Sequence, residues 1–140
     1  MQTNLLQHIL ELENMVTLKT LDTASAQEVF DQITEHLLTQ QKRSVAGPGC
    51  MYKTTDGLRC AAGCLISDEE YREEMEGYDW RGILDTFSIA NNHMALIVSM
   101  QRLHDDRPVD DWRAELAIVA SMFQLNTKVL KQFDRDETCA

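Results

Sequence analysis

Three of the four cysteines lie in one short segment, and they are the side chains best suited to chemistry in this chain. Cys50, Cys60 and Cys64 follow the pattern C-x9-C-x3-C. Thiolates bind zinc, and His104 is a candidate fourth ligand of a tetrahedral site. The pattern lacks the paired C-x2-C of zinc knuckles and ribbons, so we interpret the three cysteines as buried, apolar thiols and keep zinc binding as the alternative. We predict no cofactor.

A nucleophilic thiol is a second alternative for this segment. Cys60 or Cys64, together with His104 and Asp105, would provide the residue types of a Cys-His-Asp arrangement. Cys64 also precedes an expected helix start, where a thiol pKa is often lowered. The chain carries no sequence signature of a cysteine protease or acyltransferase. We therefore predict no catalytic residues and favour a protein that is not an enzyme.

The same segment also offers basic and aromatic side chains to a small ligand. Residues 51–53 and 58–61 flank Thr54-Thr55-Asp56-Gly57, and Asp-Gly supplies the positive φ of a tight turn. This pattern predicts a β-hairpin over about residues 50–62, docked on helices because a lone hairpin is marginal in water. Such a patch suits a nucleotide or a short single strand better than duplex DNA. The candidate ligand-binding residues are Tyr52, Lys53, Arg59, Cys60, Cys64 and His104.

Negative charge dominates the chain, whose formal net charge is −10. Residues 68–85 hold eight acidic residues against two arginines, whereas residues 42–59 are locally basic. An acidic surface repels nucleic-acid phosphates and suits a protein partner with a basic surface. A solvated face that only confers solubility is the alternative. The candidate partner-surface residues in this stretch are Asp68, Glu69, Glu73 and Glu76.

Nothing in the sequence indicates export or membrane insertion. Residues 1–13 lack the basic start of a signal peptide and carry Glu11 and Glu13. No apolar run approaches the roughly 18 residues that a membrane span needs. Cys139 lies in a polar tail, and the other cysteines are odd in number, which favours free thiols in a reducing compartment. We therefore expect a cytoplasmic protein.

Helical periodicity dominates the rest of the chain, which at 140 residues is expected to form one domain. Ser25 and Ser67 each begin a capping box, and the second should open a short helix to about Met75. Residues 15–21 are ambiguous, because their threonines and valine also suit a short strand. Apolar spacing predicts helices over about 4–16, 26–41, 80–87, 88–104 and 110–123, with a last helical turn after 127.

These patterns predict a mainly α protein with a minor β part, a compact bundle of about five to six helices with one β-hairpin. We expect an N-terminal helical extension over 1–24, a single helical domain over 25–134 and a frayed tail over 135–140. The extension carries an apolar stripe that either packs on the domain or pairs with its copy in a homodimer. The candidate partner-surface residues of this stripe are Leu5, Ile9 and Leu12.

The middle of the chain carries several short motifs that occur together in a known family. They are Cys50–Tyr52, Asp56–Ala61, Gly63–Ile66, Asp68–Tyr71 and Met75–Gly77, followed by Leu103–Asp105 and Trp112. On these motifs the chain resembles a family of small, mostly uncharacterised proteins of bacteriophages and prophages. The resemblance covers roughly residues 26–125, and Ser67 stands where the family often has proline, which also suits a helix start.

The resemblance implies a phage or prophage origin and a host-cytoplasmic setting, and it implies no activity. Combined with the acidic charge, it leads us to expect an accessory protein that binds a host protein and modulates it, with no membrane contact. A small-ligand, nucleotide or zinc-binding module centred on residues 50–64 is the alternative function.

Overall fold

The computed structural model describes Leu5–Leu6 and residues 15–47 and 49–134. The α-helices in this part of the chain are α2 (Ala26–Gln40), α3 (Trp80–Thr86), α4 (Met94–Asp106), α5 (Trp112–Met122) and α6 (Lys128–Lys131). The 3-10 helices are η1 (Ala62–Leu65), η2 (Glu73–Gly77) and η3 (Val109–Asp111). Strands β1 (Val45–Ala46) and β2 (Gly49–Cys50) form one antiparallel pair. The predicted mainly α fold with a minor β part is confirmed.

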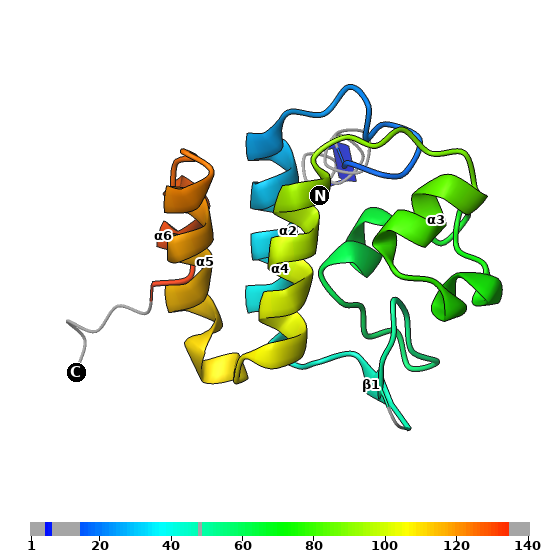
Figure 1. Cartoon of the computed structure of the whole chain (residues 1–140). Coiled ribbons are helices and arrows are strands. Elements are labelled where there is room, and N and C mark those ends of the chain that lie inside the picture. Colours follow the sequence, from blue (N-terminus) through cyan, green and yellow to red (C-terminus); the bar gives the residue numbers. More distant parts are fainter. Residues whose placement is uncertain (1–4, 7–14, 48, 135–140) are drawn as a thin grey trace.

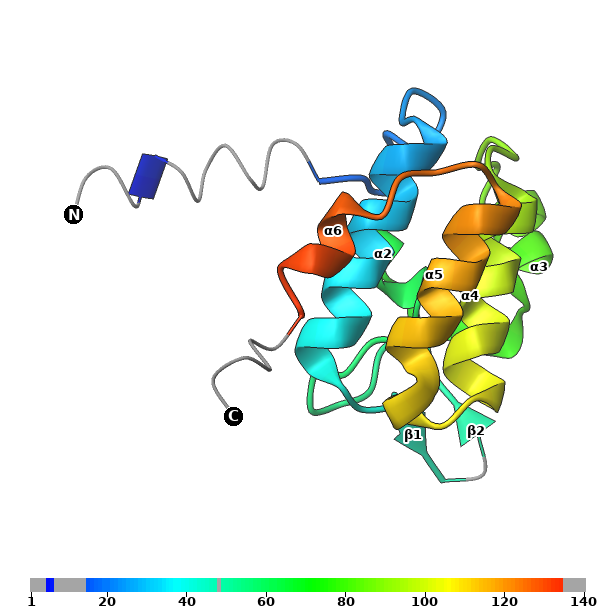
Figure 2. The same ribbon diagram turned by 90° about the vertical axis from the view of Figure 1, so that its left-hand side faces the viewer.

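Helices α2, α4 and α5 lie side by side and build the core (Figures 1 and 2). Apolar residues three or four positions apart give each helix one buried face. The fully buried side chains of these faces include Phe30, Ile33, Leu37, Ile97, Met100, Trp112 and Leu116. No helix in the described ranges is long and apolar enough to cross a membrane.

The sequence signals at most helix ends are confirmed, and α4 is the main exception. Ser25 begins α2 through the predicted capping box, in which its hydroxyl accepts the Glu28 N–H at 3.1 Å. Helix α4 begins at Met94, whereas the periodicity predicted a start near Ser88. Ser88 and His93 both have left-handed backbones, with φ of 57° and 61°, and this conformation interrupts a helix. The prediction for residues 88–93 was therefore wrong.

Part of the expected N-terminal extension belongs to the core. Val16, Leu18 and Leu21 are buried, and residues 18–23 form turns, so neither a strand nor a helix continues through this stretch. The side chain of Gln32 accepts the Val16 N–H at 2.6 Å and donates to its carbonyl at 2.8 Å. Most of the helix predicted over 4–16 lies outside the described residues, so its pairing in a homodimer stays a prediction.

The prediction of one β-hairpin is confirmed, but its position differs from the predicted range of about residues 50–62. The two strands lie at residues 45–50, and the predicted hairpin is reduced to one bridge between Lys53 and Arg59 around the turn at Gly57, whose φ is +90°. Side-chain oxygens accept backbone N–H groups that a longer β-ladder would use for its hydrogen bonds. The Glu76 carboxylate accepts the N–H of Lys53 at 3.1 Å, and Gln40 accepts the N–H of Arg59 at 3.0 Å.

The prediction of a short helix from Ser67 to Met75 is wrong, although the predicted capping box forms. Glu70 accepts the Ser67 N–H at 3.0 Å and donates its own N–H to the Ser67 hydroxyl at 3.2 Å. The Glu70 carboxylate also accepts the N–H groups of Leu18 and Lys19 at 3.1 and 2.9 Å. These bonds tie the turn to the N-terminal segment, and the backbone is extended at Arg72 before η2 begins.

Gly63 allows the closest backbone approach in this part of the fold. A Cβ at Gly63 would lie 2.0 Å from the carbonyl oxygen of Tyr52, far inside van der Waals contact. The η1 turn and the segment that carries Tyr52 therefore pack together only because residue 63 has no side chain.

We predict that Gly63→Ala destabilises the fold by about 3 kcal/mol or more, because one of the two backbones must move. Gly77→Ala is the matched control, since nothing lies within 4 Å of a Cβ there, and we expect a change within about 1 kcal/mol. Denaturant unfolding of both variants measures the difference. Equal stabilities would contradict the packing described at Gly63.

Candidate functional site

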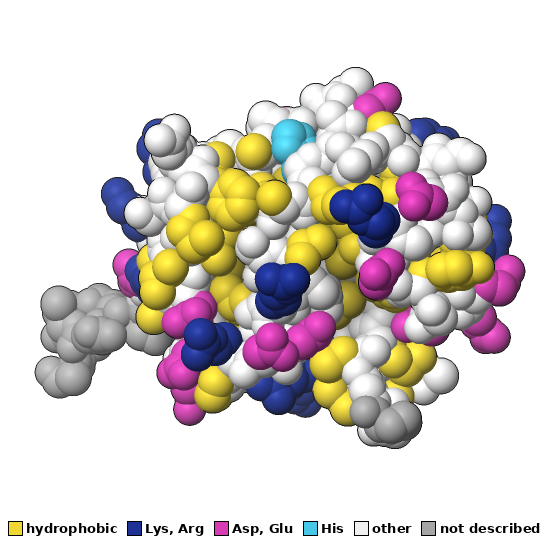
Figure 3. Space-filling model, in the orientation of Figure 1, with side chains coloured by type: hydrophobic (Ala, Val, Ile, Leu, Met, Phe, Trp, Pro, Cys, Tyr) yellow, Lys and Arg dark blue, Asp and Glu magenta, His cyan; other side chains and the backbone are white. Residues whose placement is uncertain are grey.

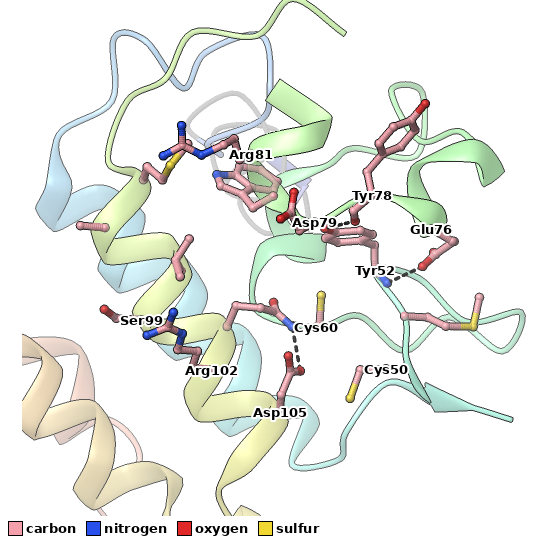
Figure 4. A pocket seen from close by; sticks show the side chains of 16 residues that line it. Cys50, Tyr52, Cys60, Glu76, Tyr78, Asp79, Arg81, Ser99, Arg102 and Asp105 are labelled. Carbon is pink, nitrogen blue, oxygen red and sulfur yellow. Dashed lines mark hydrogen bonds between the residues drawn. The ribbon is translucent and has the colours of Figure 1, made fainter. Parts of the chain in front are cut away.

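An open cleft of about 840 Å³ runs along α4, opposite residues 50–52 and 76–81 (Figure 4). Helix α4 contributes Met94, Val98 and Arg102 to this cleft. These three residues are four positions apart, so they share one face of the helix. On the molecular face shown in Figure 3, hydrophobic side chains are interspersed with basic and acidic ones. The lining of the cleft itself combines apolar and charged side chains.

Glu76 fixes the wall of the cleft opposite α4. Its carboxylate accepts the N–H groups of Tyr52 and Lys53 at 3.0 and 3.1 Å and the Tyr71 hydroxyl at 2.6 Å. The Tyr52 hydroxyl donates to the Tyr78 carbonyl at 2.8 Å. Burial raises the pKa of Tyr52, so this hydroxyl stays protonated and keeps its bond. Glu76, a predicted partner-surface residue, is therefore used inside the protein.

A buried histidine lies behind one end of the cleft. The His104 ring is fully buried and stacks on Trp112, with 5.5 Å between the ring centroids. The Ser44 N–H donates to His104 Nε2 at 3.2 Å, so Nε2 carries no proton. The proton is then on Nδ1, which donates to Asp105 Oδ1 at 2.8 Å. Both ring nitrogens of His104 are therefore already in use.

Asp105 connects this histidine to the cleft and to Cys50. Its carboxylate also accepts from Gln101 Nε2 at 2.9 Å, as Figure 4 shows. Burial opposes its ionisation, but hydrogen bonds from His104, Cys50 and Gln101 hold the pKa of Asp105 below its usual value. The charged carboxylate is thus placed beside the Cys50 thiol.

The predicted zinc ligands do not converge as a set. Within the described ranges, the group of three ligand atoms that lie within 4.8 Å of one another belongs to Cys50, His104 and Asp105. Cys60 and Cys64 are outside it. A metal on His104 Nδ1 would move the ring proton to Nε2, which faces the Ser44 N–H. Zinc binding by His104 would therefore break an existing hydrogen bond.

The thiols are also poor nucleophiles. Partial burial and the Asp105 carboxylate raise the pKa of Cys50 to about 11, and burial raises that of Cys60 to about 12. Burial and the neighbouring Cys60 raise the pKa of Cys64 as well, so the expectation of a lowered value there was wrong. Because only thiolates attack well, these values oppose a Cys-His-Asp mechanism near neutral pH.

The remaining ligand candidates divide into two groups. Tyr52 and Cys60 line the cleft, as does the predicted metal ligand Cys50. Lys53 and Arg59 instead form ion pairs with Asp68 away from the cleft. Cys64 and His104 also lie outside the lining. The structure thus brings two of the six predicted ligand-binding residues to one site.

The acidic partner surface is smaller than the sequence indicated. Asp68 pairs with Lys53 and Arg59, while Asp79 caps α3 by accepting the Gly82 N–H at 2.8 Å. Glu69 and Glu73 are exposed, and their carboxylates make no hydrogen bond with the described residues. Leu5 is 61% exposed. Ile9 and Leu12 lie outside the described residues.

Two arginines of the cleft were not among the site residues predicted from the sequence. Arg81 and Arg102 line it, and neither forms a hydrogen bond or an ion pair within the described ranges. The other arginines of these ranges all have partners, namely Arg43, Arg59, Arg72, Arg107 and Arg113. The spacing of Met94, Val98 and Arg102 was the available signal, because it marks a second face of α4 beside the core face.

Comparisons with protein-family models, curated proteins and solved structures found no match to this chain. The cleft, its fixed wall and its two arginines are therefore the features on which a functional proposal rests. Together they can bind a group that has an apolar part and a polar part.

We predict that Asp105→Asn lowers the pKa of Cys50 from about 11, because the carboxylate disfavours the thiolate beside it. Alkylation by iodoacetamide, followed at Cys50 by peptide mass spectrometry from pH 7 to 11, should show a lower midpoint and faster reaction at pH 9. Asp110→Asn, on the exposed η3 turn, is the control. An unchanged midpoint in Asp105→Asn would rule out this electrostatic coupling.

We predict that Glu76→Ala costs about 2 kcal/mol of stability, because two backbone N–H groups and the Tyr71 hydroxyl lose their acceptor. Glu74→Ala, on the same 3-10 helix and exposed, should change stability by less than about 0.5 kcal/mol. Thermal or denaturant unfolding measures both. Similar losses in the two variants would show that Glu76 does not fix the wall.

Proposed function

We propose that the chain is a non-catalytic interaction protein of the phage or prophage type, which binds a host protein in the bacterial cytoplasm and modulates its activity. The single observation that carries this proposal is the open cleft along α4, whose lining combines apolar side chains with two arginines that have no partner in the described part. In this proposal a short segment of the partner protein enters the cleft.

The composition of the lining supports a binding role. Met94, Trp80 and Tyr52 lie in the cleft together with Arg81 and Arg102. Aromatic residues, methionine and arginine are the types enriched where proteins bind other proteins, and tryptophan, tyrosine and arginine most often dominate the binding energy. The wall opposite α4 is held by Glu76, so little ordering of that wall would be needed on binding.

The state of the ionisable groups supports binding rather than catalysis. The raised thiol pKa values keep Cys50 and Cys60 protonated near pH 7. His104 has a hydrogen-bond partner at each ring nitrogen and is fully buried, so it is not placed to accept a proton from a substrate in the cleft.

The charge of the molecule supports a protein partner over nucleic acid. The net charge of −10 repels polyanions at long range. The exposed carboxylates of Glu73 and Glu74 lie in η2, just before Glu76 along the chain. A partner with basic residues around its inserted segment would meet them favourably.

The alternative function is a small-ligand or zinc site at the Cys50 end of the cleft, favoured by the close approach of Cys50, His104 and Asp105. A native mass spectrum taken after incubation with zinc and removal of excess metal separates the two. One bound zinc ion that is lost in Cys50→Ala would favour the alternative, whereas a bare mass would favour the interaction protein.

We predict that Ala95→Trp abolishes partner binding, because it places an indole in the cleft from an exposed position of α4. Ala114→Trp is the matched control, since Ala114 is exposed on α5 and does not line the cleft. Affinity capture from a bacterial lysate, quantified by mass spectrometry, should recover the same partner with the wild type and Ala114→Trp. A partner retained by Ala95→Trp would contradict binding in the cleft.

A further inference from the structure

We infer that the protein forms a homodimer in which α5 of one copy packs antiparallel against α5 of a second copy. The surface involved, the α5 face, consists of Ala114, Ala117, Ile118, Ser121 and Met122. The inference goes beyond the proposed function, and the dimer leaves the cleft open because no residue of α5 lines it.

The outer side of α5 is apolar although the protein is strongly acidic. Ile118 is 52% exposed and Met122 is 66% exposed, and Ala114 is exposed one turn before Ile118. These three residues are four positions apart, so they share one side of the helix. Figure 3 shows hydrophobic side chains gathered over the part of the molecule where α5 lies in Figure 1. Contiguous exposed apolar groups of this kind mark a surface that contacts another protein.

No charged side chain interrupts the α5 face. The charged residues of α5 are Arg113 and Glu115, and both are used at its margins, where Arg113 pairs with Asp134 and Glu115 pairs with Arg107. Helix α5 lies at the surface of the bundle and buries its other side against α2 and α4 (Figure 2). A surface helix of a monomer normally has a polar outer side, whereas α5 is apolar on both sides. This composition is typical of a helix that is covered on both sides.

The order of side chains along the face fits a second copy of the same face. Ala114 and Met122 lie four residues before and after Ile118. In an antiparallel pair that crosses at Ile118, the two isoleucines meet at the twofold axis, and each long Met122 lies opposite the small Ala114 of the second copy. Ala117 and Ser121 are also small, so the two helices can approach closely. The face is therefore complementary to itself in shape.

The charges beyond the two ends of the face favour the same arrangement. Residues 105–115 hold five acidic residues against two arginines, whereas residues 116–133 hold two lysines and no acidic residue. Asp110 and Asp111 before the face and Lys128 after it are exposed, and they form no ion pair with the described residues. An antiparallel pair brings the acidic end of one copy towards the basic end of the other, whereas a parallel pair would bring two acidic ends together.

The test is the mass of the full-length protein in solution, measured by sedimentation equilibrium. One helix face is at the small end of specific interfaces, so we expect a reversible monomer–dimer equilibrium between about 1 µM and about 1 mM. Ile118→Lys should raise the dissociation constant about tenfold or more, because it would bury two ammonium groups together. Val45→Lys is the matched control, since Val45 is a 47% exposed aliphatic residue of β1 outside the α5 face, and it should leave the equilibrium unchanged.

Two further substitutions test the orientation of the helices. Ala114→Lys and Met122→Glu should each weaken the dimer, because each places an unpaired charge in an apolar contact. Combined in one chain, they should restore dimerisation relative to either single variant, since the antiparallel pair brings the new ammonium group of one copy next to the new carboxylate of the other. Within one copy the two positions are more than two turns apart, too far to pair.

A wild-type protein that stays monomeric over the whole range would overturn the inference and leave the α5 face to a different partner. A dimer that persists in Ile118→Lys would also overturn it, and loss of that dimer in Leu5→Lys would assign the contact to the N-terminal stripe. A double variant no stronger than the single variants would overturn the antiparallel pairing. Circular dichroism of each variant checks that the fold is intact. None of these substitutions lies in the cleft, so the proposed function stands or falls separately.

Discussion

Backbone N–H and C=O groups outside helices and sheets must find other partners when they are buried, and residues 41–79 depend on side chains for this. Glu76 accepts two N–H groups of the segment at Tyr52, and Gln40 bonds to both the N–H and the carbonyl of Arg59. Arg59 in turn donates to the Gly63 carbonyl at 3.0 Å. These side chains replace the ladder of a hairpin. Gln40 attaches the irregular segment to α2, and Gln101 of α4 accepts the Ala62 N–H at 2.9 Å.

This constraint also shapes the candidate site. Glu76, Asp79 and Asp105 each serve the fold, because they hold the wall, the start of α3 and the His104 ring. Arg81 and Arg102 have no hydrogen-bond or ion-pair partner in the described part, although the protein is strongly acidic.

Several residues that resemble catalytic or metal-binding groups have structural roles here. His104 is buried between Ser44, Asp105 and the face of Trp112, and an aromatic ring stacked in this way contributes packing as well as hydrogen bonds. Cys60 is 1% exposed and accepts the Gly63 N–H at 3.2 Å, as a small buried side chain does. The residue types of a reactive site are present, but these side chains are buried and hydrogen-bonded, so they stabilise the fold.

The sequence alone determined the helices with clear local signals, such as α2 with its Ser25 capping box and the apolar spacing of α4 and α5, because these depend on residues a few positions apart. The long-range bonds were decided only by the tertiary structure. Nothing near Glu76 in the sequence shows that it binds the backbone of Tyr52 and Lys53, and nothing near Arg81 shows that it lines the same cleft as Arg102. Hydrogen bonds between distant segments depend on how the helices pack, so the position of the hairpin and the site could not be read from local pattern.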